Sequence, residues 1–200
     1  DRSDTAEGGY AYFNSFLTMR DIGPEGLMVE GVYDKHHLVP FGEYLPLGSL
    51  MTQFGIRSLV HVPADFTPGP VPAPIDLPGL PSVQPLICYE ALFPGYVPAR
   101  GDARPDWIAN VSNDAWFGQT SGPLQHLNLA SYRAIETGLP MVRATPTGTS
   151  AMIDAYGRIR DDQRLDSGEA GVIDAYLPQI AAQTLFGRWG DAGFWVLMVL

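Results

Sequence analysis

The chain of 200 residues has little positive charge and almost no cysteine. It contains one cysteine, Cys88, and one lysine, Lys35, so that eleven of its 12 basic residues are arginines. A single cysteine excludes a disulfide within the chain. The formal charge of -10, with no cluster of Lys and Arg, argues against binding nucleic acid through a basic surface. Both rare residues sit in motifs that suit them to chemistry, although a lone lysine is often only a solvated side chain.

The two ends of the chain differ in character. The first residues, 1–9, are polar and acidic and lack the basic start and apolar core of a signal peptide, so we expect the sequence to begin inside a longer protein. From Ala192 the chain reads AGFWVLMVL, which is too short to cross a bilayer, since a spanning helix needs about 20 residues. This run is either a buried C-terminal helix or strand, or the start of a membrane helix with Trp189 and Trp195 as interfacial aromatics and Arg188 just outside.

Hydrophobic patterns between the ends alternate between strands and helices, which predicts an α/β sheet covered by helices. The clearest helix runs from Pro123 to Thr137, where Leu and Ala recur at three- and four-residue spacing from Leu124 to Ala134. A shorter helix is predicted from Glu90 to Arg100, and turns at Gly23-Pro24 and Tyr156-Gly157. The predicted strands are Ala11–Met19, Gly26–Tyr33, Val83–Cys88, Asp106–Ser112, Pro140–Thr145, Thr149–Ala155 and Gly171–Tyr176.

A proline-rich segment separates the lysine motif from the cysteine motif. Residues 68–85 hold seven of the 18 prolines, which predicts neither a helix nor an inner strand there. The segment is either a connecting surface loop or a recognition arm. Because the two motifs lie more than fifty positions apart, their side chains can meet only through the tertiary fold.

The lysine motif is YDKHHLVPFGEYLP, residues 33–46. Lys35 follows a predicted strand, and the turn at Pro40 and Gly42 can bring Glu43 back to pair with it. The alternative for Glu43 is a surface carboxylate. His36 and His37 are adjacent, but no further Cys, Asp or His at suitable spacing completes a metal site, so we expect no metal.

The cysteine motif is PLICYEALFP, residues 85–94. Cys88 ends an apolar strand and precedes a helix-like segment, which is the geometry that exposes a nucleophile at a sharp turn. Backbone N–H groups after such a residue can receive an oxyanion. A free cysteine is also often a small buried hydrophobe, and the acidic neighbour Glu90 disfavours a thiolate unless a cation such as Lys35 offsets it.

Four segments together resemble a known family. They are DKHHLVPFGEYLP, ICYEALFP, NVSNDAWFG and GPLQHLNLASYRAIETGLPMVRATPTGTSAMIDAYGRI, which occur in order across roughly residues 10–177. They are similar to the carbon-nitrogen hydrolase (nitrilase) superfamily, and within it to the apolipoprotein N-acyltransferase family of the bacterial inner membrane. The resemblance implies an α/β fold, a nitrilase-like α-β-β-α sandwich present in part, over residues 1–186. Residues 187–200 would then be a juxtamembrane segment and the start of a C-terminal transmembrane helix.

The resemblance also implies the site. It places the lysine and the nucleophile of the family's Glu-Lys-Cys triad on Lys35 and Cys88, and an additional active-site glutamate on Glu43. Tyr89 and Glu90 match supporting residues after the nucleophile. The general-base glutamate of the family lies upstream of the lysine motif, where this chain offers only Glu7 in a loop-like context, so we expect that base to be missing and the fragment alone to be inactive.

The implied reaction is acyl transfer without a cofactor. A phospholipid would donate a fatty acyl chain to Cys88 as a thioester, and the N-terminal diacylglyceryl-cysteine of an apolipoprotein would accept it, on the periplasmic side of the inner membrane. Lys35 and the backbone N–H of Tyr89 would stabilise the oxyanion. Trp116 and Phe117 would belong to mobile arms that exclude water, or would simply pack at the sheet edge.

Two other functions stay open at this point. A soluble amidase of the same superfamily would use the same lysine and cysteine with water as acceptor, but its C-terminal tail should be polar. A non-catalytic scaffold that keeps the fold is supported only by the absent base.

Overall fold

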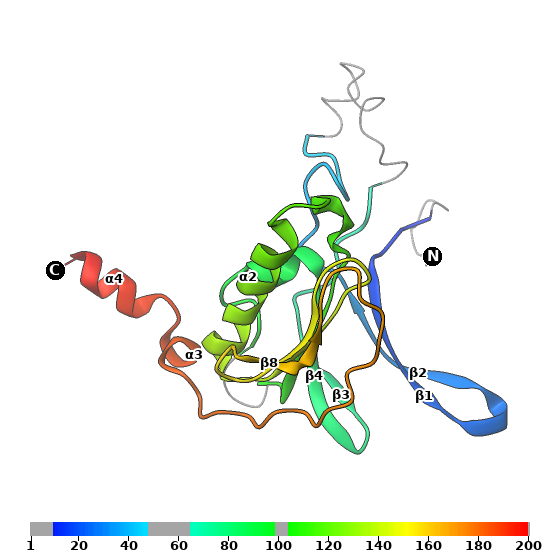
Figure 1. Ribbon diagram of the computed structural model, residues 1–200. Coiled ribbons are helices and arrows are strands. Elements are labelled where there is room, and N and C mark those ends of the chain that lie inside the picture. Colours follow the sequence, from blue (N-terminus) through cyan, green and yellow to red (C-terminus); the bar gives the residue numbers. More distant parts are fainter. Residues whose placement is uncertain (1–9, 48–64, 99–103, 200) are drawn as a thin grey trace. The chain divides into compact units, whose positions relative to one another are not determined.

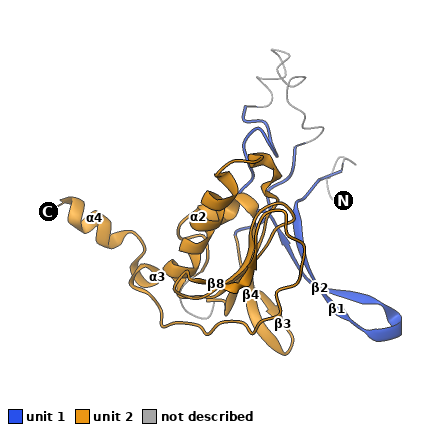
Figure 2. Cartoon of the chain, viewed as in Figure 1, with its two compact units in different colours: residues 1–71 blue, residues 72–200 orange. Residues whose placement is uncertain are grey.

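The computed structural model describes residues 10–47, 65–98 and 104–199. The chain divides into two compact units, residues 1–71 and residues 72–200 (Figure 2). Each unit is described by itself below.

Unit 1 is built around a hairpin. Strands β1 (Ser15–Asp21) and β2 (Leu27–Asp34) pair antiparallel, and a short 3-10 turn, η1 (Gly23–Glu25), joins them (Figure 1). Gly23 and Gly26 have φ of 73° and 99°, a region that glycine enters without a steric penalty. The two predicted strands and the turn between them are confirmed. The end of β2 is buried, and the chain then enters the lysine motif.

Unit 2 contains one six-stranded mixed sheet. Its order is β3-β4-β5-β6-β7-β8, in which β4, β5 and β6 are parallel and the outer pairs are antiparallel. Four of these strands match predicted ones to within a few residues. The strands are β3 (Ile75–Leu77), β4 (Leu80–Ile87), β5 (Trp107–Val111), β6 (Met141–Ala144), β7 (Ser150–Ile153) and β8 (Ile159–Leu165).

Helix α2 (Gly122–Thr137) covers one face of this sheet (Figure 1) and confirms the strongest helix prediction. Its buried stripe continues the core of the sheet, but Leu124 points to solvent and is not part of it. The reason is register: the stripe passes through His126, Ala130 and Ala134, four residues apart. The core cluster comprises Leu86, Ala91, Val97, Ile108, Leu127, Ala130, Ala134, Leu139, Met141, Ala151 and Ile153.

The proline-rich segment is more regular than predicted. It contains β3 and most of β4, and β4 is an inner strand because it lies between β3 and β5, so the exclusion of an inner strand was wrong. β3 is short and pairs with β4 only between Leu80 and Val83, and the register of that pairing is irregular where Pro81 lies. Pro85 lies past the end of β3, and its carbonyl accepts a hydrogen bond from the Gln84 side chain.

One predicted strand is absent, and besides β3 one further strand was missed. Residues 171–176 form no strand, and both Val172 and Tyr176 are almost fully exposed, so no sheet face buries their apolar side chains. The missed strand, β8, has the sequence IRDDQRL, whose charges hide a strand pattern. Charged side chains are usual on an edge strand because they discourage pairing with other chains.

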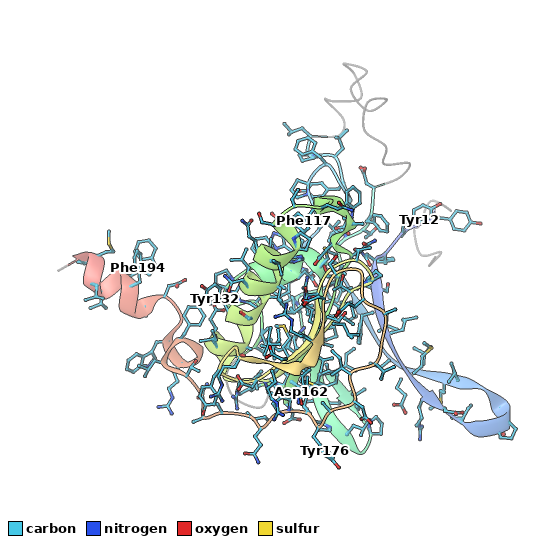
Figure 3. The ribbon with its side chains drawn as sticks, viewed as in Figure 1. Tyr12, Phe117, Tyr132, Asp162, Tyr176 and Phe194 are labelled. Atoms are coloured by element: carbon cyan, nitrogen blue, oxygen red, sulfur yellow. The ribbon has the colours of Figure 1, made fainter. Side chains whose placement is uncertain are left out.

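The remaining helices are short. The predicted helix from Glu90 to Arg100 is only a 3-10 turn, η3 (Cys88–Leu92), and residues 99–103 lie outside the described ranges. The C-terminal run forms α3 (Leu185–Trp189) and α4 (Ala192–Val199). All of α4 is exposed, including Phe194 (Figure 3), so burial of this run is wrong for the described residues. Within the described parts of the chain, the helices are too short or too polar to cross a bilayer.

Gly138 ends α2 and allows a stability test with a matched control. Its φ is 68°, and a Cβ there would lie 2.8 Å from the backbone carbonyl of Ala182. Gly79, in the β3–β4 turn, has φ of 76° but open space around it. We expect Gly79→Ala to lower the free energy of unfolding by about 1 kcal/mol, and Gly138→Ala by roughly 2–3 kcal/mol because a backbone clash adds to the strain. Urea denaturation of both variants measures this, and equal losses would contradict the packing at Gly138.

Candidate active site

Lys35 forms a buried ion pair with Glu43 in unit 1. The Lys35 Nζ lies 2.8 Å and 2.7 Å from the two carboxylate oxygens of Glu43. Lys35 is 1% exposed, so its ammonium is held inside the unit and is not a solvated surface charge. The predicted pair is confirmed, and the alternative of Glu43 as an unpaired surface carboxylate is wrong.

The turn between these two residues brings Glu43 into place. The Glu43 and Phe41 N–H groups donate to the carbonyls of Val39 and Tyr44, which closes the predicted turn after Pro40. The Glu43 carboxylate accepts two further hydrogen bonds, from the Val39 N–H at 2.8 Å and from Asn14 Nδ2 at 2.9 Å. Four donor contacts therefore fix the carboxylate, and through it the ammonium of Lys35.

The two histidines beside Lys35 fall on the same loop. His36 Nδ1 lies 2.8 Å from the carbonyl oxygen of Gly69, and the Gly69 N–H donates to the carbonyl of Lys35 at 2.9 Å. These contacts tie the lysine loop to the segment that ends unit 1. His36 thus has a structural contact, while Glu7, the upstream acid considered from the sequence, lies outside the described residues.

Cys88 stands at a sharp turn in unit 2. It directly follows β4 and begins η3, and its φ of 50° places a residue with a side chain in the left-handed region. That region costs about 1–2 kcal/mol for a residue other than glycine, and such strain is often found at functional sites. The thiol is free and half-buried, so the alternative in which Cys88 is a small buried hydrophobe is wrong.

The buried side chain of Glu90 supports this turn through hydrogen bonds. It is fully buried, and its carboxylate accepts hydrogen bonds from the Ile87 N–H at 2.8 Å and from the Tyr96 hydroxyl at 2.6 Å. The first bond spans Cys88, because Ile87 precedes it and Glu90 follows it, and the second ties Glu90 to a residue further along the chain. Glu90 is thus directed into the protein, and Tyr89 packs edge-on against the ring of Phe93.

The aromatic residues of the NDAWFG segment lie on a second 3-10 turn, η5 (Asp114–Phe117). Trp116 is 81% exposed, so packing at the sheet edge does not describe it. Phe117 lies beside the start of α2 (Figure 3) and contacts the imidazole of His126 edge-on, with ring centroids 5.6 Å apart.

A buried polar cluster that the sequence reading did not identify lies under the Cys88 turn. Its members come from the carboxyl ends of β5 and β6, from η5 and from the first turns of α2, where ligand sites of α/β sheets commonly form. Asn110 and Arg143 follow the core residues Ile108 and Met141 by two positions, so they share the face that α2 covers. The cluster is Asn110, Ser112, Asp114, His126 and Arg143, all buried.

Asp114 is the centre of this cluster. Its two oxygens contact Arg143 Nη2 at 2.7 Å and His126 Nδ1 at 2.8 Å, and the Ser112 hydroxyl donates to it at 2.8 Å. Burial alone would raise the pKa of this carboxyl, but the His126 contact and the Arg143 charge outweigh burial and lower the pKa to about 2. Asp114 is therefore a carboxylate at neutral pH. Arg143 also donates to the Asn110 side chain.

A sequence signal for this cluster exists but is weak. His126 precedes Ala130 and Ala134 by four and eight residues, so a strict helical projection places it on the buried stripe of α2. The stripe that was predicted starts instead at Leu124, which is exposed. Arg143 lies two positions after the core residue Met141 on β6, but no sequence pattern there predicts that its charged side chain is buried.

Comparison with known proteins finds close relatives in bacteria. The apolipoprotein N-acyltransferase of Caulobacter vibrioides is 51% identical over 94% of this chain and 35% of its own length. Those of Bradyrhizobium diazoefficiens and Brucella melitensis are 49% and 43% identical, over 86% and 98% of this chain. The chain spans about a third of the length of these relatives.

Solved structures share the fold at much lower identity. A carbon-nitrogen hydrolase from Helicobacter pylori G27 superposes with a TM-score of 0.51 at 17% identity, over 78% of this chain and 53% of its own. An amidase from Nesterenkonia sp. AN1, with acrylamide added to its active-site cysteine, gives 0.53 at 20% identity, over 93% of this chain and 68% of its own. The chain therefore has part of a nitrilase-like α/β fold.

The sequence profile of one family covers most of the chain. The carbon-nitrogen hydrolase profile matches residues 5–184, which include most of both units and both the lysine and the cysteine motifs. The chain belongs to the carbon-nitrogen hydrolase family.

Proposed function

We propose that this chain is part of an apolipoprotein N-acyltransferase in which Cys88 is the nucleophile. The observation that carries the proposal is the strained Cys88 turn, braced by the buried Glu90, in a chain 51% identical to such an enzyme over 94% of its length. The substrates are a phospholipid as acyl donor and the N-terminal diacylglyceryl-cysteine of an apolipoprotein as acceptor. The enzyme needs no cofactor and no metal.

The reaction has two steps. The Cys88 thiolate attacks the ester carbonyl carbon of the phospholipid, the C–O bond breaks, and the lysophospholipid leaves with a proton as its alcohol. The α-amino group of the acceptor then attacks the thioester carbon. The C–S bond breaks, an amide forms, and the amine proton passes through the acid–base group, which earlier took the thiol proton, to the Cys88 sulfur.

Lys35 and Tyr89 stabilise the charge that develops on the carbonyl oxygen. A buried ammonium held by Glu43 is a preorganised cation, and the backbone N–H of Tyr89 directly follows the nucleophile. Glu43 acts as the residue that positions Lys35, because its oxygens already accept hydrogen bonds from Lys35, Asn14 and Val39. The assignment of Lys35 and Cys88 to one carbonyl rests on the resemblance of both motifs to the family.

The proton acceptor comes from outside the described residues. The carboxylates of the two motifs, Asp34, Glu43 and Glu90, each accept hydrogen bonds within the structure. The chain also spans about a third of its relatives. We therefore infer that the 200-residue chain alone does not turn over.

The C-terminal segment, residues 187–200, is the juxtamembrane part and the start of a transmembrane helix, and residues 1–186 are the partial catalytic domain. The support is α4, whose apolar side chains are all exposed although nothing in its sequence is polar. The enzyme then lies in the bacterial inner membrane with its catalytic domain on the periplasmic side, where Trp116, exposed on η5, can help to exclude water from the thioester.

The first prediction concerns the acyl-enzyme. Full-length enzyme incubated with phospholipid carrying a labelled acyl chain should gain one acyl group on Cys88 that hydroxylamine releases, because thioesters are cleaved by that nucleophile. Cys88→Ala should gain none. Mass spectrometry of the Cys88 peptide measures the adduct. Label on another residue, or none on wild-type enzyme, would overturn the proposed function, and turnover of small amides with water as acceptor would favour the amidase.

The second prediction tests the buried ammonium. Lys35→Arg in the full-length enzyme should slow thioester formation about 100-fold or more, because a guanidinium is too bulky and planar for a site that is 1% exposed. Arg20→Lys is the matched control: Arg20 pairs with Glu30 and its side chain is 53% exposed, so the rate should not change. Single-turnover kinetics measures both, and full activity of Lys35→Arg would contradict the assigned role.

The third prediction tests the membrane segment. The chain should float with vesicles of phosphatidylethanolamine and phosphatidylglycerol through α4. Val196→Asp should weaken this binding roughly tenfold, since a charge on an apolar helix opposes entry into the bilayer. Val172→Asp makes the same change at an exposed position outside α4 and should bind as wild type does. Equal binding by all three proteins would show that α4 does not enter lipid.

A further inference from the structure

His126 links the buried polar cluster to the Cys88 turn. Its Nδ1 lies 2.8 Å from Asp114 Oδ1, and its Nε2 lies 3.3 Å from the carbonyl oxygen of Cys88. The side chain is 2% exposed, so water does not compete for these contacts. The ring is further fixed by the edge of Phe117.

The Nε2 of His126 faces an oxygen that can only accept, because the carbonyl of Cys88 has no proton to give. On the other side of the ring, Nδ1 lies near the Asp114 carboxylate, which already accepts from Ser112 and Arg143, and 3.4 Å from Arg143 Nη2. The contact between Nε2 and the Cys88 carbonyl is therefore a hydrogen bond that the ring donates. Asp114 and Arg143 set the direction of the ring, and the ring holds the Cys88 carbonyl.

The Cys88 carbonyl and the Tyr89 N–H belong to one peptide group. A peptide group is planar and trans, so its C=O and N–H point in opposite directions and turn together. A donor that holds the Cys88 oxygen therefore fixes the direction of the Tyr89 N–H. Polarising the carbonyl also strengthens the N–H as a donor, because linked hydrogen bonds reinforce one another.

We propose that His126 is a positioning residue that orients the Cys88–Tyr89 peptide group so that the Tyr89 N–H meets the oxyanion formed at Cys88. The inference rests on the proposed function, in which that N–H is an oxyanion donor. Glu90 holds the Leu86–Ile87 peptide group through the Ile87 N–H, and His126 holds the Cys88–Tyr89 peptide group through the Cys88 carbonyl. The left-handed backbone of Cys88 is thus fixed from both sides.

Two neutral substitutions separate the two contacts of His126 in the full-length enzyme. In His126→Gln the side-chain amide reaches the position of Nε2 and can still donate to Cys88, whereas in His126→Asn it reaches only the position of Nδ1 and can donate to Asp114. We expect His126→Gln to form the thioester within about threefold of the wild-type rate. His126→Asn should be at least roughly tenfold slower at saturating phospholipid, with an unchanged KM.

Alkylation of Cys88 by iodoacetamide, read on the Cys88 peptide, controls for folding. This displacement forms no oxyanion, so both variants should alkylate at rates similar to the wild-type rate, and a faster rate marks unfolded protein, whose thiol is fully accessible. If His126→Asn acylates as fast as or faster than His126→Gln, or if both lose acylation and alkylation in parallel, the residue is only structural and the inference is overturned. A wild-type enzyme that forms no thioester would instead refute the proposed function itself.

Discussion

The backbone of Cys88 is the constraint around which unit 2 is arranged. A residue with a side chain does not enter the left-handed region without cost, so its neighbours must impose that conformation. Glu90 does so through the Ile87 N–H and His126 through the Cys88 carbonyl. Each of these residues is itself held, by the Tyr96 hydroxyl and by the Asp114 carboxylate. The turn is therefore supported by buried polar contacts, and apolar packing alone would not fix its direction.

Burying charges for this purpose is costly unless each one is paired. Asp114 meets this condition with Arg143 and His126, and its low pKa shows that pairing outweighs burial there. In unit 1 the same condition is met by the Lys35–Glu43 pair. Removing one member of either group would leave a buried charge without a partner, which is far more damaging than the pair is stabilising. Within each of these two groups, the charged residues thus depend on one another as strongly as the core residues do.

Much of the fold could be predicted from local patterns, and the failures have physical causes. The hairpin and α2 were predictable because their turn residues and hydrophobic periods agree with their burial. β8 was missed because its exposed charges conceal the alternation of a strand, and residues 171–176 were misread because short apolar runs occur in exposed segments as well. Pro85 does not exclude an inner strand at β4, because β3 ends before it and no β3 partner needs its missing N–H.

The candidate site was predictable only in part, for a related reason. The Lys35–Glu43 pair is local, since a single turn brings its members together. The cluster around Asp114 joins four segments: the end of β5, η5, the start of α2 and the end of β6. Parallel pairing of β5 with β6 brings Asn110 opposite Arg143, and no pattern within either strand reveals that register.

The hydrogen bonds of Glu43 and Glu90 indicate which roles these two glutamates take in the proposed reaction. The oxygens of Glu43 accept from Lys35, Asn14 and Val39. Those of Glu90 accept from Ile87 and Tyr96. A carboxylate so engaged must break a hydrogen bond that holds the site before it can take a proton. Both glutamates are therefore suited to fixing geometry, one for the cation and one for the nucleophile. The proposed reaction therefore assigns proton transfer to a group beyond the described residues, and assigns the thiol, the ammonium and the oriented peptide N–H to this chain.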